Sequence, residues 1–198
     1  LLPFGLRAAI PNYLAQWDQA HDILEVERQL DDLLFTQMAA LASKLDHKGA
    51  AAWVRGKIDA ENIRNLLRLR RTQADAAKIA GFLHQGGVIS VDKLLGLVGE
   101  PLESWGRLLA YTDLTGALSG LQEVTDFDTL IVEVEKALDD YVLKLVEDSR
   151  FSSTAPENVL FYLWSKEMEA KNVRILLVGK ANGADRDVVR GLLRHVIV

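Results

Sequence analysis

The sequence predicts an all-α protein built from tandem repeats of antiparallel helix bundles. Apolar residues recur at helical spacing through most of the chain. No segment shows the clean alternation of a half-buried strand, and residues 87–90 offer at most a brief pairing. Two strings of residues also recur about 110 positions further along, in the same order. Together, these observations indicate a duplicated helical unit.

Two long helices are expected in the first half of the chain. One covers residues 23–45 and carries a single apolar stripe. The other covers residues 48–71, and Gly49 separates it from the first. The stripe of the first helix consists of Ile23, Val26, Leu30, Leu33, Leu34, Met38, Leu41 and Leu45.

Shorter elements are expected in the middle of the chain. A third helix over residues 74–83 stops before the pair Gly86-Gly87, which breaks helices. Ser90 is placed as an N-cap, because its hydroxyl can accept from a free N–H of the helix that follows it, residues 91–98. A further helix is expected over residues 102–112.

A second long pair closes the chain. The first member covers residues 128–150 and ends before Pro156, which suits the first turn of a new helix because its missing N–H costs nothing there. The second member runs from residue 157 to about 180, and Gly183 follows as a C-terminal stop. Residues 185–196 are expected to form a closing helix.

The internal repeat is visible in two pairs of strings. VERQLDDLL (26–34) recurs as VEKALDDYV (134–142), offset by 108 residues. KIDAENIRNLLRLR (57–70) recurs as EMEAKNVRILLVGK (167–180), offset by 110 residues. Because order and spacing are both kept, duplication explains the matches better than chance. We therefore expect two helical repeats, residues 1–100 and residues 101–198.

An acid-x-x-Asn-x-Arg motif stands in each copy of the second string. Positions i and i+3 share a face of a helix, so the acid and the asparagine form a polar stripe. Arg55 extends this stripe in the first copy and Ser165 in the second. The arginine points elsewhere and is expected to serve a neighbouring helix. The motif residues are Asp59, Asn62, Arg64, Glu169, Asn172 and Arg174.

Two interpretations of the motif are open. It is either a binding or catalytic face, or a polar network that is satisfied between packed helices. Buried polar groups cost several kcal/mol unless they are paired. A network that is kept in both repeats, with Asp and Glu interchanged, favours the structural interpretation, in which the motif specifies how helices pack.

No catalytic, cofactor-binding or metal site is predicted. The chain has no cysteine, no phosphate-binding Gly-x-x-x-x-Gly-Lys loop and no Gly-x-Ser-x-Gly elbow. None of the histidines stands at helical metal-ligand spacing, and all are expected at the surface or at helix caps: His21, His47, His84 and His195. A metal-dependent hydrolase that uses Asp46, His47 and nearby acids stays as a remote alternative.

Charged runs have simple structural explanations. The basic run 68–71 suits the C-terminal end of a helix, where positive charge is favourable. The acidic pairs 31–32 and 139–140 are expected on solvated faces. A net charge of −5 argues against a nucleic-acid-binding protein.

The sequence does not predict a membrane span. No uninterrupted apolar run approaches the roughly 20 residues that cross a bilayer. The chain starts at Leu1 without a basic region before it, so we expect a fragment end there and not a signal peptide.

The strings KIDAENIRNLLRLR and PENVLFYLWSKEMEAKNVRILLVGKANG resemble the C subunits of bacterial and archaeal V/A-type ATPases, which are related to the d subunits of eukaryotic V-ATPases. The segment Gly86–Ser90 is similar to a glycine pair of that family. The resemblance covers residues from about Pro11 to Arg194. It implies three related helical repeats in a funnel, of which this chain resembles the second and third.

The resemblance also implies a function. Such a protein is a non-catalytic part of the central-stalk rotor, located in the cytoplasm at the membrane surface. It is a socket that links the central-axle subunits to the membrane proteolipid ring, and it couples ATP turnover on other subunits to proton or sodium translocation. It needs no cofactor. The alternative is a helical-repeat adaptor unrelated to ATPases.

Overall fold

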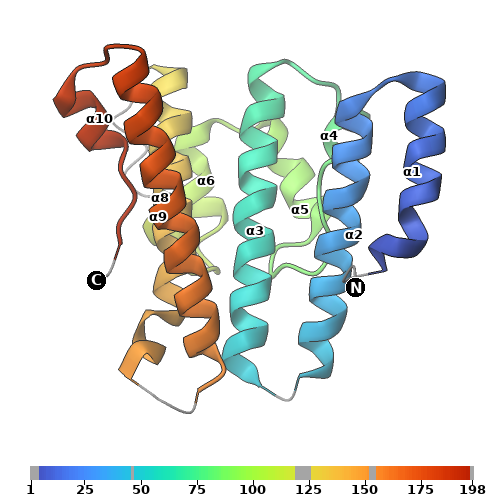
Figure 1. Ribbon diagram of the computed structural model, residues 1–198, viewed down its shortest axis with the longest axis horizontal. Helices are drawn as coiled ribbons and strands as arrows, with labels where there is room; N and C mark the ends of the chain where they lie inside the picture. The colour runs from blue at the N-terminus through green and yellow to red at the C-terminus, as the bar shows by residue number, and fades with distance from the viewer. Residues whose placement is uncertain (1–4, 46, 119–125, 152–154, 197–198) are drawn as a thin grey trace.

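The computed structural model describes residues 5–45, 47–118, 126–151 and 155–196, and these residues form helices and connecting segments without a strand (Figure 1). The all-α prediction is confirmed. The α-helices are α1 (Leu6–Ala20), α2 (Ile23–Lys44), α3 (Lys48–Arg71), α4 (Ala76–Gly81), α5 (Val91–Gly96), α6 (Leu102–Leu108), α7 (Thr115–Leu118), α8 (Phe127–Glu147), α9 (Glu157–Ala181) and α10 (Arg186–Leu192). The 3-10 helices are η1 (Leu97–Gly99) and η3 (Asp148–Phe151).

The long helix α3 lies at the centre of the molecule. Figure 1 shows α2 and α9 on either side of it, α1 beyond α2, α8 behind α9, and α5 and α6 at the back. α3 packs against α2, α8, α4, α5 and α9. The two long helix pairs, α2 with α3 and α8 with α9, correspond to the two pairs expected from the sequence.

The core follows the apolar stripes of α3 and α8. Ile63 and Leu66 of α3 and Val134 and Leu138 of α8 have no exposed surface. Fully burying such a side chain stabilises the fold by about 1.5–3 kcal/mol relative to leaving it exposed. Packing of these stripes therefore supplies much of the stability that joins the two helix pairs.

The helix ends behave as the sequence predicts at two positions. The Ser90 hydroxyl accepts from the Lys93 N–H at 3.4 Å and caps α5. At the other end of the chain, Gly183 has a φ of +63°, a left-handed conformation that glycine adopts without strain. Its N–H donates to the Lys180 carbonyl at 3.2 Å, and this bond closes the last turn of α9.

Several elements differ from expectation. No helix was expected before residue 23, whereas α1 forms there with Pro11 inside it, a residue that removes a backbone donor. The helices expected over 102–112 and 185–196 are shorter, ending at Leu108 and Leu192. The brief strand at 87–90 is wrong, since the N–H groups of Val88 and Ile89 donate to a side chain on α3 instead.

Across the described part of the chain, no helix is both long enough and apolar enough to cross a bilayer.

Candidate functional site

The polar stripe of α3 binds the main chain of the segment that follows α4. Asn62 Nδ2 donates to the His84 carbonyl at 2.9 Å, and Asn62 Oδ1 accepts from the His84 N–H at 2.7 Å. One turn earlier on α3, the Asp59 carboxylate accepts from the N–H groups of Val88 at 2.9 Å and Ile89 at 3.1 Å. The stripe therefore holds a loop in place, and its side chains are occupied by backbone groups.

The glycine pair fits this loop against α3. Gly86 has a φ of +101°, which side chains other than glycine adopt only with strain. A Cβ added to Gly87 would collide with Asp59 Oδ1. The pair is needed because one residue turns the chain and the next lets the backbone reach the carboxylate.

Asp59 is almost completely buried, with 1% of its surface exposed. Burial raises its pKa to about 6, although the hydrogen bonds from the Ile89 and Val88 N–H groups oppose the shift. The carboxyl group thus titrates near the lower end of the physiological range.

The second repeat contains the same asparagine arrangement. Asn172 Nδ2 donates to the Arg194 carbonyl at 3.0 Å, and Asn172 Oδ1 accepts from the Arg194 N–H at 2.7 Å. In each repeat the partner lies 22 residues after the asparagine. The acid of the motif behaves differently, because Glu169 pairs with Lys166 at 2.7 Å on the partly exposed side of α9.

A buried cluster around Asp139 joins the two long helix pairs. Its carboxylate accepts from Arg64 Nη2 of α3 at 2.5 Å, from Lys171 Nζ of α9 at 2.7 Å and from Arg194 Nε at 2.8 Å. Asp139 has no exposed surface, and Arg64 is 7% exposed. The Arg64 side chain therefore reaches a neighbouring helix, since Asp139 lies on α8.

The positive side chains of the cluster more than offset the cost of burying the Asp139 carboxylate. Burial alone raises the pKa of Asp139, but the positive charges of Arg64 and Lys171 and the hydrogen bond from Arg194 outweigh it, and the pKa lies below its ordinary value. The expectation that residues 139–140 form a solvated face is therefore wrong for Asp139. Its three partners come from segments far apart in the sequence, so the pair of aspartates gave no sign of them.

The remaining residues of the predicted stripes do not join these clusters. Arg55 is exposed, and Ser165 is buried without a hydrogen-bond partner for its hydroxyl among the described residues. Arg174 is exposed, and no hydrogen bond or ion pair reaches it within the described part of the chain, so it does not serve a neighbouring helix as expected. The motif therefore has different surroundings in its two copies.

The histidines occupy different environments from one another. His21 caps the end of α1 and His47 precedes α3, as expected for cap residues. His84 was expected at a surface or cap but is 2% exposed, and its ring packs against Phe35 with centroids 4.6 Å apart. Asp46, the proposed partner of His47 in a hydrolase, lies outside the described residues.

The basic run at the end of α3 pairs with α8. Arg68 Nη2 lies 2.5 Å from Glu135 Oε1, and Arg71 Nε lies 3.2 Å from Asp128 Oδ1. Both arginines are more than half exposed, so each pair contributes at most about 1 kcal/mol. Sequence reasoning missed these pairs because it considered the run only against the end of its own helix.

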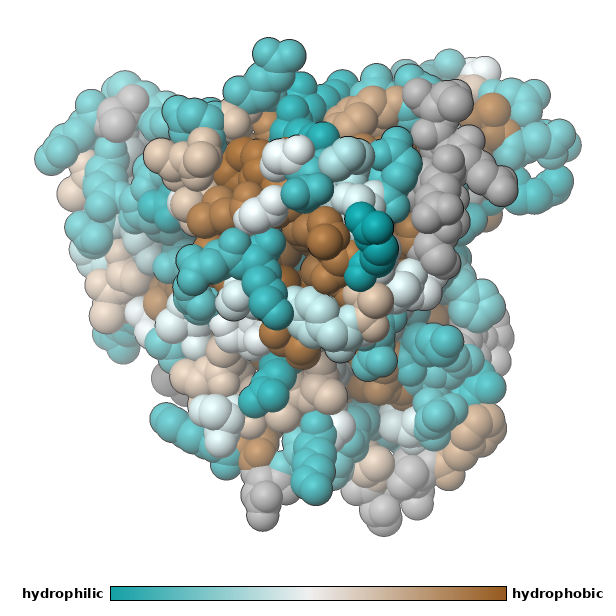
Figure 2. Space-filling view, turned by 180° about the vertical axis from the view of Figure 1, so that it is seen from behind, coloured by the Kyte–Doolittle hydropathy of each residue, from teal (hydrophilic) through white to brown (hydrophobic). Residues whose placement is uncertain are grey.

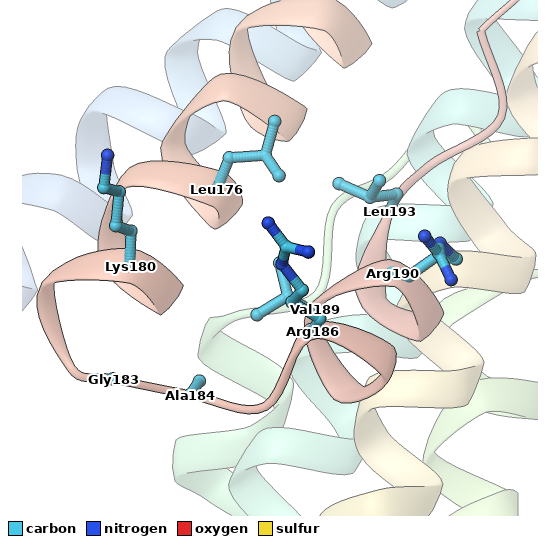
Figure 3. Close-up of a pocket in the computed structure, with 8 residues that line it drawn as sticks. All are labelled: Leu176, Lys180, Gly183, Ala184, Arg186, Val189, Arg190 and Leu193. Carbon is cyan, nitrogen blue, oxygen red and sulfur yellow. The ribbon is translucent and has the colours of Figure 1, made fainter.

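A cavity of about 610 Å³ lies between α9 and α10 (Figure 3). Leu176, Val189 and Leu193 form its apolar part, and its charged residues are all basic: Lys180, Arg186 and Arg190. No carboxylate lines it, so it offers neither a general base nor a metal ligand of that kind. Figure 2 shows apolar residues near the middle of the rear face, on the side of the molecule where α5 and α6 lie.

Comparison with known proteins identifies relatives over most of the chain. The chain is 27% identical to the C subunit of the A-type ATP synthase of Methanococcoides burtonii, over 87% of this chain and 49% of that protein. It is 30% identical to the C subunit of the A-type ATP synthase of Haloferax volcanii, over 96% of this chain and 53% of that protein. It is 25% identical to the C subunit of the V-type sodium ATPase of Enterococcus hirae, over 84% of this chain and 50% of that protein.

The chain thus spans about half the length of the curated relatives it matches. No solved structure matches it. The family model described as ATP synthase (C/AC39) subunit matches residues 3–192, which is nearly the whole chain. The chain belongs to the ATP synthase (C/AC39) subunit family.

Proposed function

We propose that this chain is part of a non-catalytic central-stalk subunit of a V/A-type rotary ATPase. In this role it links the central-axle subunits to the membrane proteolipid ring, and so couples ATP turnover to ion translocation. The whole polypeptide works in the cytoplasm, peripheral to the membrane. Family membership supports this proposal, because relatives are named as C subunits of A-type ATP synthases and of a V-type sodium ATPase.

The structural observation that carries the proposal is the Asp139 cluster. It connects α3, α8, α9 and the segment after α10 through buried charged hydrogen bonds. Fully satisfied buried networks of this kind fix one arrangement of helices. A protein that passes torque between an axle and a ring needs such stiffness, because a pliable socket would absorb the rotation.

Within this function we propose a structural role for the repeated motif. Asn62 and Asn172 each bind the main chain 22 residues later. Asp59 holds the glycine loop and Arg64 joins the repeats, while Glu169 lies at the surface of α9. This proposal agrees with two helical repeats over residues 1–100 and 101–198, each locked by its own asparagine.

Affinity purification of the whole polypeptide that contains this chain tests the function. We expect the catalytic, axle and ring subunits of its rotary ATPase to co-purify in mild detergent. A helical-repeat adaptor unrelated to ATPases would instead purify without them, and that result would reject the proposal. The whole polypeptide with Arg186→Glu should co-purify with the same subunits, since Arg186 lies outside the buried clusters.

A further inference from the structure

The ion pair between Arg64 and Asp139 joins positions that the internal repeat contains twice. Arg64 lies on α3, the second long helix of the first pair, and Asp139 lies on α8, the first long helix of the next pair. The repeat offsets of 110 and 108 residues align them with Arg174 on α9 and Asp31 on α2. The chain therefore carries a second arginine and a second aspartate at the same places in the repeat.

Arg174 lies on an open face of α9. Val173 and Leu177 lie beside it and are 53% and 64% exposed. The aligned residues of α3, Ile63 and Leu67, are 0% and 2% exposed, because α3 is packed among other helices. No hydrogen bond or ion pair reaches Arg174 among the described residues. The face keeps the apolar residues and the cation of the α3 interface, but no helix covers it with an acid.

The carboxylate of Asp31 lacks the cations that surround Asp139. Lys171 and Arg194, from the same repeat as Asp139, both donate to its carboxylate. The repeat offset aligns these two cations with Glu61 and His84. The helix α1, which also packs against α2, brings no positive side chain to Asp31 in the described part of the chain.

The surroundings of Asp31 disfavour its negative charge. Burial raises its pKa, and the negative charges of Glu61 and Glu27 add to the shift, while His84 opposes it. No hydrogen bond or ion pair holds the carboxylate within the described residues. An arginine that meets Asp31 as Arg64 meets Asp139 would supply the positive charge.

The repeat indicates where both partners come from. The interface that Arg64 makes with α8 forms between two units of one polypeptide, and units in such arrays pack against their neighbours. The chain spans about half the length of its curated relatives, so these contain as much sequence again, enough for a further unit of about 110 residues. A second copy could set its Asp31 against Arg174, but this head-to-tail contact leaves the same two faces open at the ends of the pair.

We propose that the α9 docking face, defined as Ala170, Val173, Arg174 and Leu177, binds the first long helix of a further repeat unit in the part of the same polypeptide that lies outside these 198 residues, through a carboxylate that pairs with Arg174. Asp31 pairs in the same way with a motif arginine from that part of the polypeptide. This inference goes beyond the proposed function, because it concerns contacts inside one polypeptide and not contacts with axle or ring.

Photo-cross-linking in the purified whole polypeptide, without other subunits, tests the source of the helix. Benzoylphenylalanine in place of Leu177 lies on the docking face, and a mixture of ¹⁵N-labelled and unlabelled polypeptide separates contacts within one molecule from contacts between copies. We expect residue 177 to be joined to an acid-bearing helix outside this chain, with both peptides carrying the same label. Benzoylphenylalanine in place of Leu108 is the control, since Leu108 is exposed on α6, at the back of the molecule (Figure 1).

Three results of the cross-linking overturn the proposal. The first is a product that joins differently labelled peptides, because a second copy then covers the face. The second is a product confined to residues of this chain. The third is no product from position 177 in the purified polypeptide, because the face then waits for another subunit. Failure to co-purify the ATPase rejects the proposed function and leaves this test intact.

The pairing of Arg174 is tested by charge. In the whole polypeptide, Arg174→Glu should reduce the yield of the cross-link from position 177 at least tenfold and lower the melting temperature, whereas Arg174→Lys keeps the charge and most of the yield. Arg186→Glu is the matched control, because it makes the same change outside the docking face. A yield that Arg174→Glu leaves unchanged means that no carboxylate pairs with Arg174, and the proposal is wrong.

The pairing of Asp31 is tested by the sign of a stability change. Asp31→Lys should lower the melting temperature of the whole polypeptide, because two positive side chains then meet. Without an arginine from outside this chain, the same substitution would raise the melting temperature, since it removes repulsion from Glu27 and Glu61. A raised or unchanged melting temperature overturns the second pair. Asp18→Lys, on the exposed side of α1, is the matched control.

Discussion

Asn172 binds the main chain of Arg194 through both atoms of its amide, donating to the carbonyl and accepting from the N–H. Asn62 makes the same two bonds with His84 in the first repeat. Such a pair mimics the pairing of two backbone amides, and it fixes the segment after a short helix against the long helix that precedes it. The asparagine is therefore the part of the motif whose contacts are the same in both repeats.

Replacing Asn62 with alanine should lower the free energy of unfolding by about 2–4 kcal/mol. The change leaves the N–H and carbonyl of the buried His84 without their partners, and each unsatisfied buried group costs about 1–3 kcal/mol. Urea denaturation of the purified chain measures the effect. Asn172→Ala should cost less, because Asn172 is only partly buried.

Asn12→Ala is the matched control for both asparagine variants, since Asn12 is exposed on α1 and should change stability by less than about 0.5 kcal/mol. The same variants separate structure from binding. If Asn172→Ala abolishes co-purification with the ATPase while its melting temperature equals that of the wild type, the polar stripe is a binding face and its structural interpretation is wrong.

Asp139→Asn should destabilise the chain by about 3–5 kcal/mol, because it removes the buried carboxylate that Arg64 and Arg194 share and leaves them only the partly exposed Glu61 and Glu135. Thermal unfolding followed by circular dichroism measures this loss. Asp140→Asn is the control on the neighbouring, half-buried position. Equal effects of the two substitutions would show that the Asp139 cluster is not what joins the repeats.

The stability of the chain should depend on pH through Asp59. Its folded-state pKa is raised to about 6, so between about pH 4 and pH 6 the folded chain holds a proton that the unfolded chain releases. Its contribution is fully present below about pH 4 and is lost as the pH rises through 6. The two-unit shift corresponds to about 3 kcal/mol.

Urea denaturation of the wild type and Asp59→Asn across this range isolates the contribution of Asp59. We expect the stability of the wild type, relative to the variant, to decrease as the pH rises from 4 to 7. If the difference in unfolding free energy between the wild type and the variant stays constant with pH, the folded-state pKa of Asp59 is not raised. Asp139 has the opposite dependence. Its pKa is lowered in the folded chain, so its contribution to stability is present at neutral pH and is lost as the pH falls through that pKa.

Gly87→Ala should destabilise the chain through Asp59. The added methyl group would collide with the Asp59 carboxylate and displace the loop that donates to it. A double-mutant cycle with Asp59→Ala checks this cause. The cost of Gly87→Ala should be smaller when Asp59 is already absent, and additive costs would place the effect elsewhere.

The long helices were predictable because their apolar stripes recur at helical spacing over many turns. α2, α3, α8 and α9 begin and end within a few residues of the expected positions. α1 was not among the expected helices; Pro11 lies inside it, and the helix packs on α2. Proline inside a helix is a local signal against it, so packing of this kind is what the local pattern does not contain.

The polar positions were predictable from the sequence, but their partners were not. The motif identified Asp59, Asn62 and Asn172 as polar positions on long helices, but their partners are backbone groups 22 to 30 residues away, which no side-chain pattern reveals. The sequence places Asp139 on a solvated face, because acidic pairs usually are solvated. Its burial depends on cations from three separate segments, so only the folded arrangement identifies it.

The central claim is that the chain belongs to a coupling component of the ATPase and not to a catalytic one. ATP hydrolysis and ion uptake, measured together in membrane vesicles with and without the polypeptide that contains this chain, test it most directly. We predict that vesicles without it keep ATP hydrolysis on the catalytic subunits and lose ATP-driven ion uptake, and that adding the polypeptide back restores uptake. Ion uptake that persists in its absence would contradict the account.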